Sequence, residues 1–190
     1  MPQPAIALLL AGGASARMGR DKATLEFRDR PLWQHMAQTL QEAGCRDVMI
    51  SGDPDRIPAA FPDSVPGLGP LAGLATALAR TGDGHRLLVV PVDLPLFDAV
   101  TARLLLAAPP AGAVSFHGHA LPALLRVDVT LRTALAALLA DPDPRMHAVH
   151  RLLARLETRE IALPVTHEAA LTNTNSPEEW QRALARAGPP

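Results

Sequence analysis

Cysteine is almost absent from this 190-residue sequence, in which Cys45 is the only example. A single cysteine excludes an intramolecular disulfide and any zinc or iron–sulfur site that requires several thiolates. With no catalytic partner evident in the sequence, Cys45 is expected to be a small buried residue. The lack of disulfides fits a reducing compartment, and we expect the protein to be cytoplasmic.

Long apolar runs and an excess of charge are absent as well. The apolar run at 5–11 is far shorter than the ~20 residues of a membrane-spanning helix, and no basic segment precedes it as in a signal peptide. The formal net charge is −1, whereas DNA-wrapping and membrane-surface proteins concentrate positive charge on one face. We therefore expect neither a nucleic-acid partner nor a membrane, and the composition favours a small soluble ligand.

Lysine is nearly absent too, because Lys22 is one of the 18 basic residues and arginine supplies all the others. Lys22 ends a glycine-rich segment of the sequence. A compact ammonium on a flexible stem is suited to reaching phosphates, and arginine is not its equivalent there. The position of the lone lysine therefore points to phosphate binding by this segment.

Short apolar strands alternate with amphipathic helices along almost the whole sequence. Strands are expected at 5–10, 48–51, 86–92, 113–117, 120–127 and 161–165. Helices are expected at 31–43, 71–78, 98–107, 129–140, 146–156 and from 176 onward. This alternation predicts a three-layer, Rossmann-like α/β fold around a mainly parallel sheet, with one antiparallel strand within 113–127. No repeat or long linker divides the chain, so residues 1–190 are expected to form one domain.

The first predicted strand leads into a candidate phosphate-binding loop, because ligands of open α/β sheets bind at the carboxyl ends of strands. The strand is followed by Gly12 and Gly13, and then by Arg17 and Lys22. Small residues let backbone N–H groups approach an anion, and the two cations neutralise it. The spacing is neither GxGxxG nor that of a P-loop. The alternative is an ordinary turn with solvated basic side chains.

A lone carboxylate, Asp93, follows the strand at 86–92 and lies between Pro91 and Pro95. Mg²⁺ is usually held by one or two carboxylates together with substrate phosphates. Asp93 is therefore a candidate Mg²⁺ ligand opposite the phosphate loop. The alternative is a helix-capping aspartate, but Asp98 is better placed for that role because it directly precedes a helix.

The strand at 48–51 leads into a loop that contains Asp53, Asp55 and Asp63, followed by a glycine-rich segment at 67–73. These glycines allow a ligand or another backbone to approach closely, or they only tighten the loop. The sequence does not separate the two interpretations.

The remaining candidates are histidine, arginine and asparagine side chains. The pair His117 and His119 has no third metal ligand nearby, which favours a turn over a metal site. Four basic side chains are expected on or near one helical face, where they bind an anion or are simply solvated: Arg145, His147, His150 and Arg151. Asn173 and Asn175 precede the last helix and either bind a ligand or build the turn before it. That helix starts with a capping-box pattern at 176–179.

The glycine-rich run at 10–22, LAGGASARMGRDK, closely resembles the signature loop of the molybdenum cofactor guanylyltransferases. These enzymes belong to a wider nucleotidyltransferase family that includes sugar-phosphate and cytidylyl-transferring enzymes. The similarity continues in family order over essentially the whole chain, at 31–35, 69–73, 91–95 and 173–179. The Gly12–Gly13 pair and the Asp–Lys pair at 21–22 favour the guanylyl branch, since many relatives have Leu-Ala-Ala-Gly and Pro-Lys there.

The resemblance implies a nucleotidyltransferase fold and Mg²⁺-dependent transfer of GMP from GTP to the phosphate of molybdopterin carrying molybdenum, with release of pyrophosphate. It also suggests other proteins of molybdenum cofactor biosynthesis or delivery as partners. Lys22 and Asp93 become the expected catalytic residues, with Lys22 on the phosphates and Asp93 on Mg²⁺. Asp63 is expected beside the nucleoside. The full set expected to bind the nucleotide is Leu10, Ala11, Gly12, Gly13, Arg17, Lys22, Ser51, Asp63 and Asp93.

Two positions depart from the family pattern. Ser51 stands where members often carry asparagine, so this nucleoside contact is either lost or made by a shorter hydroxyl. His119–Ala120 stands where His-Pro or Gln-Pro is common, with Pro122 two residues later. The pterin-binding residues therefore stay open.

Three other functions were weighed against guanylyl transfer. A cytidylyl- or sugar-phosphate nucleotidyltransferase would use the same fold. A nucleotide-binding module without turnover is disfavoured because both Lys22 and Asp93 are retained. A dinucleotide-dependent oxidoreductase fails on the glycine spacing and on Ser51–Gly52, which stands where an acidic residue should end the second strand.

Overall fold

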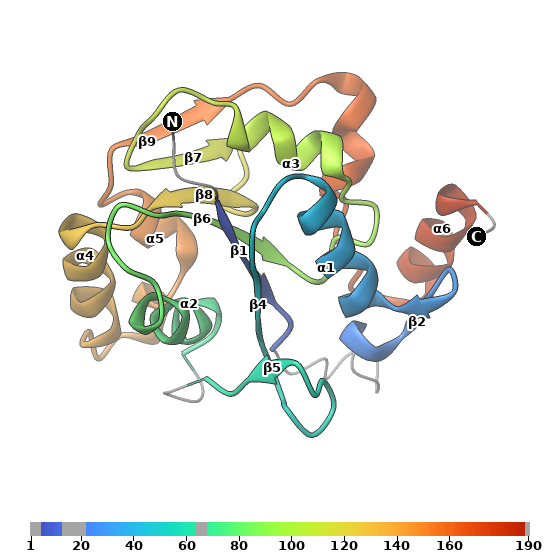
Figure 1. Cartoon of the computed structure of the whole chain (residues 1–190), viewed down its shortest axis with the longest axis horizontal. Helices are drawn as coiled ribbons and strands as arrows, with labels where there is room; N and C mark the ends of the chain where they lie inside the picture. The colour runs from blue at the N-terminus through green and yellow to red at the C-terminus, as the bar shows by residue number, and fades with distance from the viewer. Residues whose placement is uncertain (1–4, 13–21, 64–67, 189–190) are drawn as a thin grey trace.

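The computed structural model describes residues 5–12, 22–63 and 68–188. Its main sheet has seven strands in the order β5-β4-β1-β6-β8-β7-β9, and helices cover both faces (Figure 1). The strands of this sheet are β1 (Ile6–Leu10), β4 (Val48–Ser51), β5 (Ala60–Phe61), β6 (Arg86–Pro91), β7 (Ala113–Phe116), β8 (Ala123–Arg126) and β9 (Thr158–Ile161). The predicted three-layer α/β architecture is confirmed.

One strand of this sheet, β8, runs against the others. β5, β4, β1 and β6 pair in parallel, β8 is antiparallel to both β6 and β7, and β7 is parallel to β9. The expected antiparallel strand within 113–127 is therefore confirmed. As a consequence, the carboxyl ends of β1, β4, β6, β7 and β9 all lie at the same edge of the sheet.

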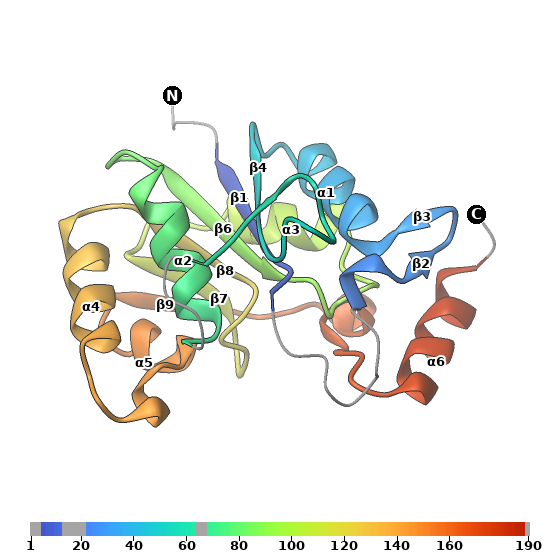
Figure 2. The same ribbon diagram turned by 90° about the horizontal axis from the view of Figure 1, so that it is seen from below.

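The helices divide into two layers, α2, α4 and α5 on one face and α1, α3 and α6 on the other (Figure 2). They are α1 (Leu32–Glu42), α2 (Pro70–Ala79), α3 (Ala99–Leu106), α4 (Val129–Leu139), α5 (Val149–Leu153) and α6 (Pro177–Ala187). Short 3₁₀ segments are η1 (Lys22–Thr24), η2 (Pro144–Met146) and η3 (Val165–Leu171). Within the described residues, no helix is both long and apolar enough to cross a membrane.

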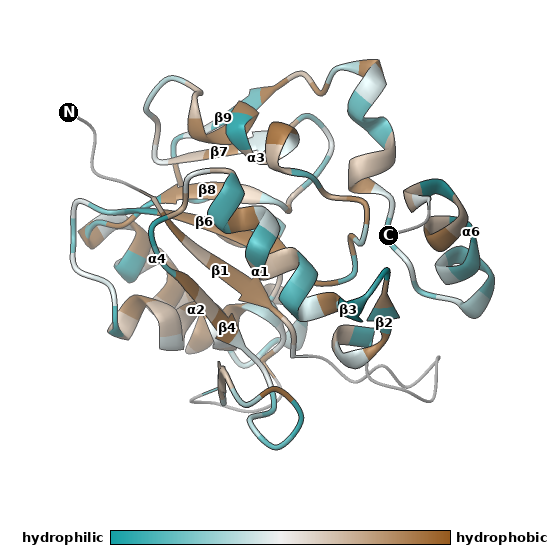
Figure 3. Ribbon diagram, turned by 45° about the vertical axis from the view of Figure 1, so that its right-hand side comes forward, coloured by the Kyte–Doolittle hydropathy of each residue, from teal (hydrophilic) through white to brown (hydrophobic). Residues whose placement is uncertain are grey.

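The central strand β1 separates two hydrophobic cores. Leu8 and Leu10 face the core under α2 and α4, while Ala7 and Leu9 face the core under α1 and α3. Successive side chains of a strand point to opposite faces, so a strand with helices on both sides has to be apolar throughout. This accounts for the uninterrupted apolar sequence of β1, which appears brown in Figure 3.

A small hairpin not predicted from the sequence, β2 (Glu26–Phe27) with β3 (Arg30–Pro31), packs against the last helix, α6. Phe27 is buried, with its ring centroid 5.8 Å from that of Trp180 on α6. The Arg28 guanidinium donates to the Ala187 carbonyl at 2.7 Å. These contacts hold α6 against the segment that follows the predicted phosphate loop.

Two predicted elements are wrong. The strand expected at 161–165 lies earlier, at β9, because it is an edge strand with exposed Arg159 and Glu160 and so lacks an apolar run. The helix expected at 146–156 is reduced to α5, preceded by η2. The backbone at His147 has a non-helical ψ of 43°, which separates the two segments.

Both predicted helix caps are confirmed. The Asp98 carboxylate accepts a hydrogen bond from the Thr101 backbone N–H at 2.7 Å. At α6, Ser176 Oγ accepts from the Glu179 N–H, and the Glu179 carboxylate accepts from the Ser176 N–H in return. The last helix therefore begins at a fixed position, directly after Asn175.

Candidate active site

The carboxyl ends of β1, β4 and β6 meet at one edge of the sheet. Leu10, the last residue of β1, is in register with Ser51 of β4 and Pro91 of β6. The pairing continues past the strand, because the Ala11 N–H donates to the Ser51 carbonyl at 2.8 Å. The three segments that the sequence singled out separately are therefore adjacent.

Ser51 and Asp63 form a hydrogen-bonded pair beside the end of β1. Ser51 is only 2 % exposed, and its hydroxyl donates to Asp63 Oδ1 at 2.6 Å. The other carboxylate oxygen, Oδ2, lies 3.7 Å from the position that a Cβ would take on Gly12. The short hydroxyl thus fixes the orientation of a carboxylate whose second oxygen is directed toward the backbone at Gly12.

Gly73 on α2 leaves room for this pair. A Cβ at position 73 would collide with Ser51 Oγ and would lie 2.8 Å from Ser51 Cβ. Only glycine therefore lets α2 approach β4 this closely. The group that approaches Gly73 closely is the Ser51 side chain, whereas the sequence analysis expected a ligand or another backbone.

Lys22 and Asp93 form the second part of the site, joined by the segment before α6. The Lys22 ammonium donates to Asn175 Oδ1 at 2.8 Å. Next to Asn175, the buried Thr174 donates its backbone N–H to the Asp93 carbonyl at 2.9 Å and its hydroxyl to the same oxygen at 3.3 Å. Asn175 thus contacts Lys22 in addition to its place in the turn before α6. Thr174 is a residue that the sequence analysis missed.

The Asp93 carboxylate has an unsatisfied oxygen. Oδ1 is buried and has no hydrogen-bond partner among the described residues. Burial raises the pKa of Asp93, and the positive charge of Lys22 acts in the opposite direction. A buried carboxylate oxygen without a partner requires an explanation, and a hard cation such as Mg²⁺ supplies one. The described residues hold no cluster of three or more His, Cys, Asp or Glu side chains that would bind a metal without substrate.

Comparison with known proteins identifies the family. Residues 7–161 match the MobA-like NTP transferase domain. The molybdenum cofactor guanylyltransferase of Xanthomonas euvesicatoria is 37% identical over 184 residues, which cover 97% of this chain and 96% of that protein. The corresponding protein of Rhizobium meliloti is 37% identical over 201 residues, covering 94% and 90%. The chain belongs to the molybdenum cofactor guanylyltransferase family.

Solved structures agree on the fold of this family member. The molybdopterin-guanine dinucleotide biosynthesis protein A of Archaeoglobus fulgidus has a TM-score of 0.74 at 17% identity, covering 95% of this chain and 97% of that one. CMP:2-keto-3-deoxy-manno-octonic acid synthetase has a TM-score of 0.68 at 15% identity, covering 97% and 98%. The predicted nucleotidyltransferase fold is thereby confirmed, and the protein is an enzyme of that class.

Several predicted site residues lie elsewhere or outside the described part of the chain. Gly13 and Arg17 are not among the described residues. Asp53 pairs with Arg56 at 3.3 Å and accepts from the Asp55 N–H at 3.0 Å, which makes a local turn. Only Asp63 of the three loop aspartates joins Ser51.

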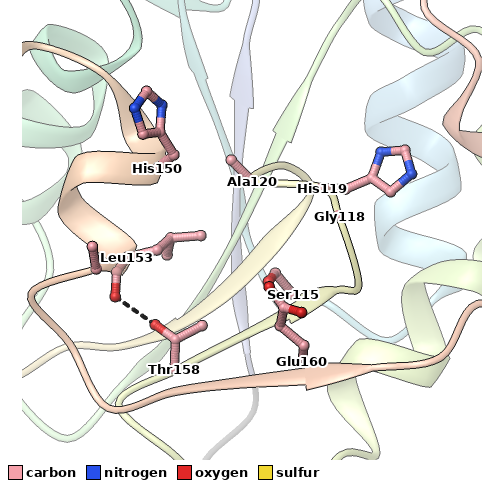
Figure 4. A pocket seen from close by; sticks show the side chains of 9 residues that line it. Ser115, Gly118, His119, Ala120, His150, Leu153, Thr158 and Glu160 are labelled. Carbon is pink, nitrogen blue, oxygen red and sulfur yellow. Dashed lines mark hydrogen bonds between the residues drawn. The ribbon is translucent and has the colours of Figure 1, made fainter.

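The expected patch of four basic side chains does not form on one helical face. His147 precedes α5, and its Nε2 hydrogen-bonds the Asp141 carbonyl at 2.9 Å. Arg145 is paired with Asp143 at 3.0 Å. His150 lines a cavity that His119 also lines (Figure 4).

The expected turn at the histidine pair is confirmed. The His119 N–H donates to the Phe116 carbonyl at 2.9 Å, and His117 Nδ1 lies 2.6 Å from Glu160 Oε2. Cys45 is 4 % exposed, and burial raises the pKa of its thiol to about 11. Cys45 is therefore a buried structural residue, as expected.

Proposed function

We propose that this chain transfers GMP from GTP to the phosphate of molybdopterin carrying molybdenum, forming the guanine dinucleotide form of the cofactor. The observation that carries this proposal is the meeting of the unsatisfied Asp93 carboxylate with Lys22 at the carboxyl edge of β6, next to the end of β1. Phosphate chemistry requires an anchored negative group for Mg²⁺ and a cation for phosphate oxygens at one place. Family membership supports GTP as donor and the molybdenum-loaded pterin as acceptor.

The reaction is a displacement at phosphorus. An oxygen of the acceptor phosphate attacks the α-phosphorus of GTP and forms a new P–O bond. The bond from the α-phosphorus to the oxygen bridging to the β-phosphate breaks, and pyrophosphate leaves with the electron pair. This chemistry depends mainly on positioning and on neutralising charge, which a fixed lysine and carboxylate can provide.

Asp93 and Lys22 have different roles in neutralising the charge of the phosphates. Asp93 would hold Mg²⁺ through its buried oxygen, and the bound ion would neutralise and orient phosphate oxygens. The Lys22 ammonium binds phosphate oxygens directly, and its bond to Asn175 holds it near Asp93 before the nucleotide arrives. The hydrogen bond from Thr174 to the Asp93 carbonyl joins the segment that carries Asn175 to the loop that carries Asp93.

Ser51 and Asp63 serve the nucleoside end of GTP. The Asp63 carboxylate accepts hydrogen bonds from nucleoside donors, and the Ser51 hydroxyl fixes its orientation. Ser51 therefore acts as a positioning residue where other members often carry asparagine. The backbone from Leu10 to Gly12 lines the nucleotide on the other side of this carboxylate.

The first prediction tests the two charged groups. Lys22→Ala and Asp93→Asn should each lower kcat/KM for GMP transfer by at least about 100-fold, because each removes charge stabilisation at the transferred group. The assay measures pyrophosphate release from GTP with molybdopterin as acceptor. Chelation of divalent cations should abolish activity, and Mg²⁺ should restore it.

Two controls accompany this assay. Arg46→Ala removes an exposed ion pair with Asp47 and should leave GMP transfer unchanged. A nucleotide panel of GTP, CTP and ATP tests the donor. The proposal fails if CTP or ATP replaces GTP without loss, or if Lys22→Ala keeps full activity. Association with other proteins of cofactor biosynthesis or delivery stays a prediction.

A further inference from the structure

The loop that carries Asp93 and the segment that carries Asn175 are in contact at two places. The loop leads from β6 into α3, and the segment leads from η3 into α6. The first contact is the hydrogen bond from the Thr174 N–H to the Asp93 carbonyl. The second lies farther from Lys22, where His167 of η3 contacts the start of α3 (Figure 1).

His167 contacts two side chains at the start of α3. Its Nδ1 lies 3.1 Å from Thr101 Oγ1 and 3.7 Å from Asp98 Oδ2. The other oxygen of this carboxylate, Oδ1, accepts from the Thr101 N–H and caps the helix. Because the neighbouring carboxylate favours a hydrogen on Nδ1, this nitrogen donates to the Thr101 hydroxyl. The imidazole thereby joins η3 to the cap of α3.

This contact is shielded from water. Thr101 is fully buried, and the His167 side chain is 22% exposed. A buried hydroxyl needs a hydrogen-bond partner, and His167 supplies one to Thr101. The backbone of the histidine is fixed as well, because the His167 N–H donates to the Pro164 carbonyl at 2.8 Å. The ring is therefore held at both its backbone and its Nδ1.

The segment η3 depends on contacts of this kind for its shape. It is a 3₁₀ helix of seven residues, whereas 3₁₀ runs longer than about three or four residues are uncommon because their hydrogen bonds are poorly aligned. Ala170 and Leu171 at its end are buried in the core, but Val165 at its start is exposed. His167 therefore anchors the first half of η3, and the core holds the second half.

A displacement of η3 would reach the phosphate end of the nucleotide site through the chain. Thr172 follows η3 with an extended backbone, and Thr174 and Asn175 come next. At its other end this stretch is fixed by the capping box of α6. The position of the stretch at 172–175 therefore depends on η3 on one side and on α6 on the other.

We propose that His167 is a positioning residue for the phosphate end of the nucleotide site, because it holds η3 against α3 and so keeps Asn175 beside Lys22. It acts through the stretch at 172–175, in which Thr174 bonds the Asp93 carbonyl and Asn175 bonds the Lys22 ammonium. The assignment rests on the proposed function, in which Lys22 binds the phosphates of GTP.

This role predicts an effect that is selective for the phosphates of the nucleotide. Lys22 and Asp93 serve the phosphates, whereas Ser51 and Asp63 serve the nucleoside and lie on β4 and in the loop after β5. Loss of His167 should therefore weaken the binding of GTP but not of guanosine, which has no phosphate. A general loss of folded protein would weaken the binding of both ligands equally.

The test uses three variants of the full chain and one control. His167→Ala removes the imidazole, and Thr101→Val removes the hydroxyl with little change in shape. His167→Asn is the conservative variant, because its amide nitrogen takes the place of Nδ1 and can still donate to Thr101. His85→Ala is the matched control, since it removes a histidine whose Nδ1 lies 3.0 Å from the Gly82 carbonyl, in the turn after α2.

A fluorescent GTP analogue bound with Mg²⁺ and displaced by GTP or by guanosine gives both affinities without any acceptor. His167→Ala and Thr101→Val should each raise the dissociation constant of GTP by about threefold to tenfold, the range expected for one lost hydrogen bond. His167→Asn and His85→Ala should stay within about twofold of wild type, and so should guanosine binding by every variant. The kcat/KM for GMP transfer should follow the same order.

A double-mutant cycle with Asn175→Ala separates positioning from general stability. His167→Ala should change the GTP affinity less in the Asn175→Ala background than in wild type, because both substitutions act on the contact with Lys22. Additive effects overturn the assignment, and so does an equal loss of GTP and guanosine affinity in His167→Ala.

The same measurements distinguish this assignment from the proposed function. Nucleotide binding that changes as expected in a protein that transfers no GMP overturns the proposed function and supports the role of His167. Normal GMP transfer by wild type, together with unchanged GTP affinity and kcat/KM in His167→Ala, overturns the role of His167 and leaves the proposed function intact.

Discussion

At the scale of single residues, the packing of Gly73 on α2 against Ser51 determines where Ser51 and its partner Asp63 lie. Gly73→Ala would force Ser51 and with it Asp63 to move, because the new Cβ collides with Ser51 Oγ. We expect a loss of about 1–3 kcal/mol of unfolding free energy, as for other overpacked sites, together with weaker GTP binding. Urea denaturation and a GTP titration measure the two effects.

Gly82→Ala is the matched control for this substitution. Its Cβ would meet only His85, at an ordinary contact distance of 3.8 Å. The coupling is disproved if Gly73→Ala destabilises the protein no more than Gly82→Ala does, or if it leaves GTP affinity unchanged.

The sequence indicates which candidate residues lie together where they follow a strand. Asp93 was predicted from its position after an apolar strand and Lys22 from its place in the glycine-rich segment, and the structure links Lys22 to Asn175 near Asp93. The Ser51–Asp63 bond was not predictable, because it depends on a loop conformation 12 residues long.

At the scale of elements, the start of α6 controls the position of Asn175. The Glu179 carboxylate accepts hydrogen bonds from the backbone N–H groups of Asn175 and Ser176. The bond from Asn175 is the main cause that lowers the pKa of Glu179 below its ordinary value. Because the pKa of Glu179 is lower in the folded protein than in the unfolded one, the ionised carboxylate stabilises the folded state at pH values above the ordinary glutamate pKa. This stabilisation is lost as the pH falls through the pKa that Glu179 has in the folded protein.

Glu179→Gln should therefore weaken the start of α6 at neutral pH and remove part of the acid sensitivity of the protein. Wild type should lose stability as the pH falls below ~4.3, the ordinary glutamate value, whereas the variant should change less over that range. Urea unfolding at neutral and acidic pH measures this difference. Glu168→Gln on η3 is the control, and an equal pH dependence in wild type and Glu179→Gln would contradict the argument.

Secondary structure was predictable where a single pattern dominates. β4 was predicted to the residue because it is a short apolar run, and α4 within one residue because its leucines recur at helical spacing. β9 was misplaced because edge strands expose polar side chains. The hairpin of β2 and β3 has strands of two residues each, too short for any periodicity. With α5 and β9 both misjudged, the cavity between them was beyond the reach of the sequence.

At the scale of the whole molecule, an aromatic contact and a hydrogen bond hold α6 against the hairpin of β2 and β3. Trp180 on α6 packs against Phe27 of the hairpin, and Trp180 is 7 % exposed. Trp180→Ala should cost about 3–5 kcal/mol of stability, as for other large-to-small core substitutions. It should also weaken GTP binding, because α6 carries Asn175 toward Lys22.

Thermal denaturation and a GTP titration test this prediction. Val165→Ala, at a side chain that is 79% exposed, should change neither quantity. If Trp180→Ala lowers stability but leaves GTP affinity at the wild-type value, then α6 has no part in positioning Lys22.

The reversed strand β8 divides the sheet into two halves that stay tied to each other. The strands before it, β5, β4, β1 and β6, end beside Ser51 and Asp93, and the chain returns to this place after β9 with Thr174 and Asn175. A chimera that exchanges the second half of the chain between two relatives therefore has to retain the segment at 173–176 to keep Lys22 beside Asn175.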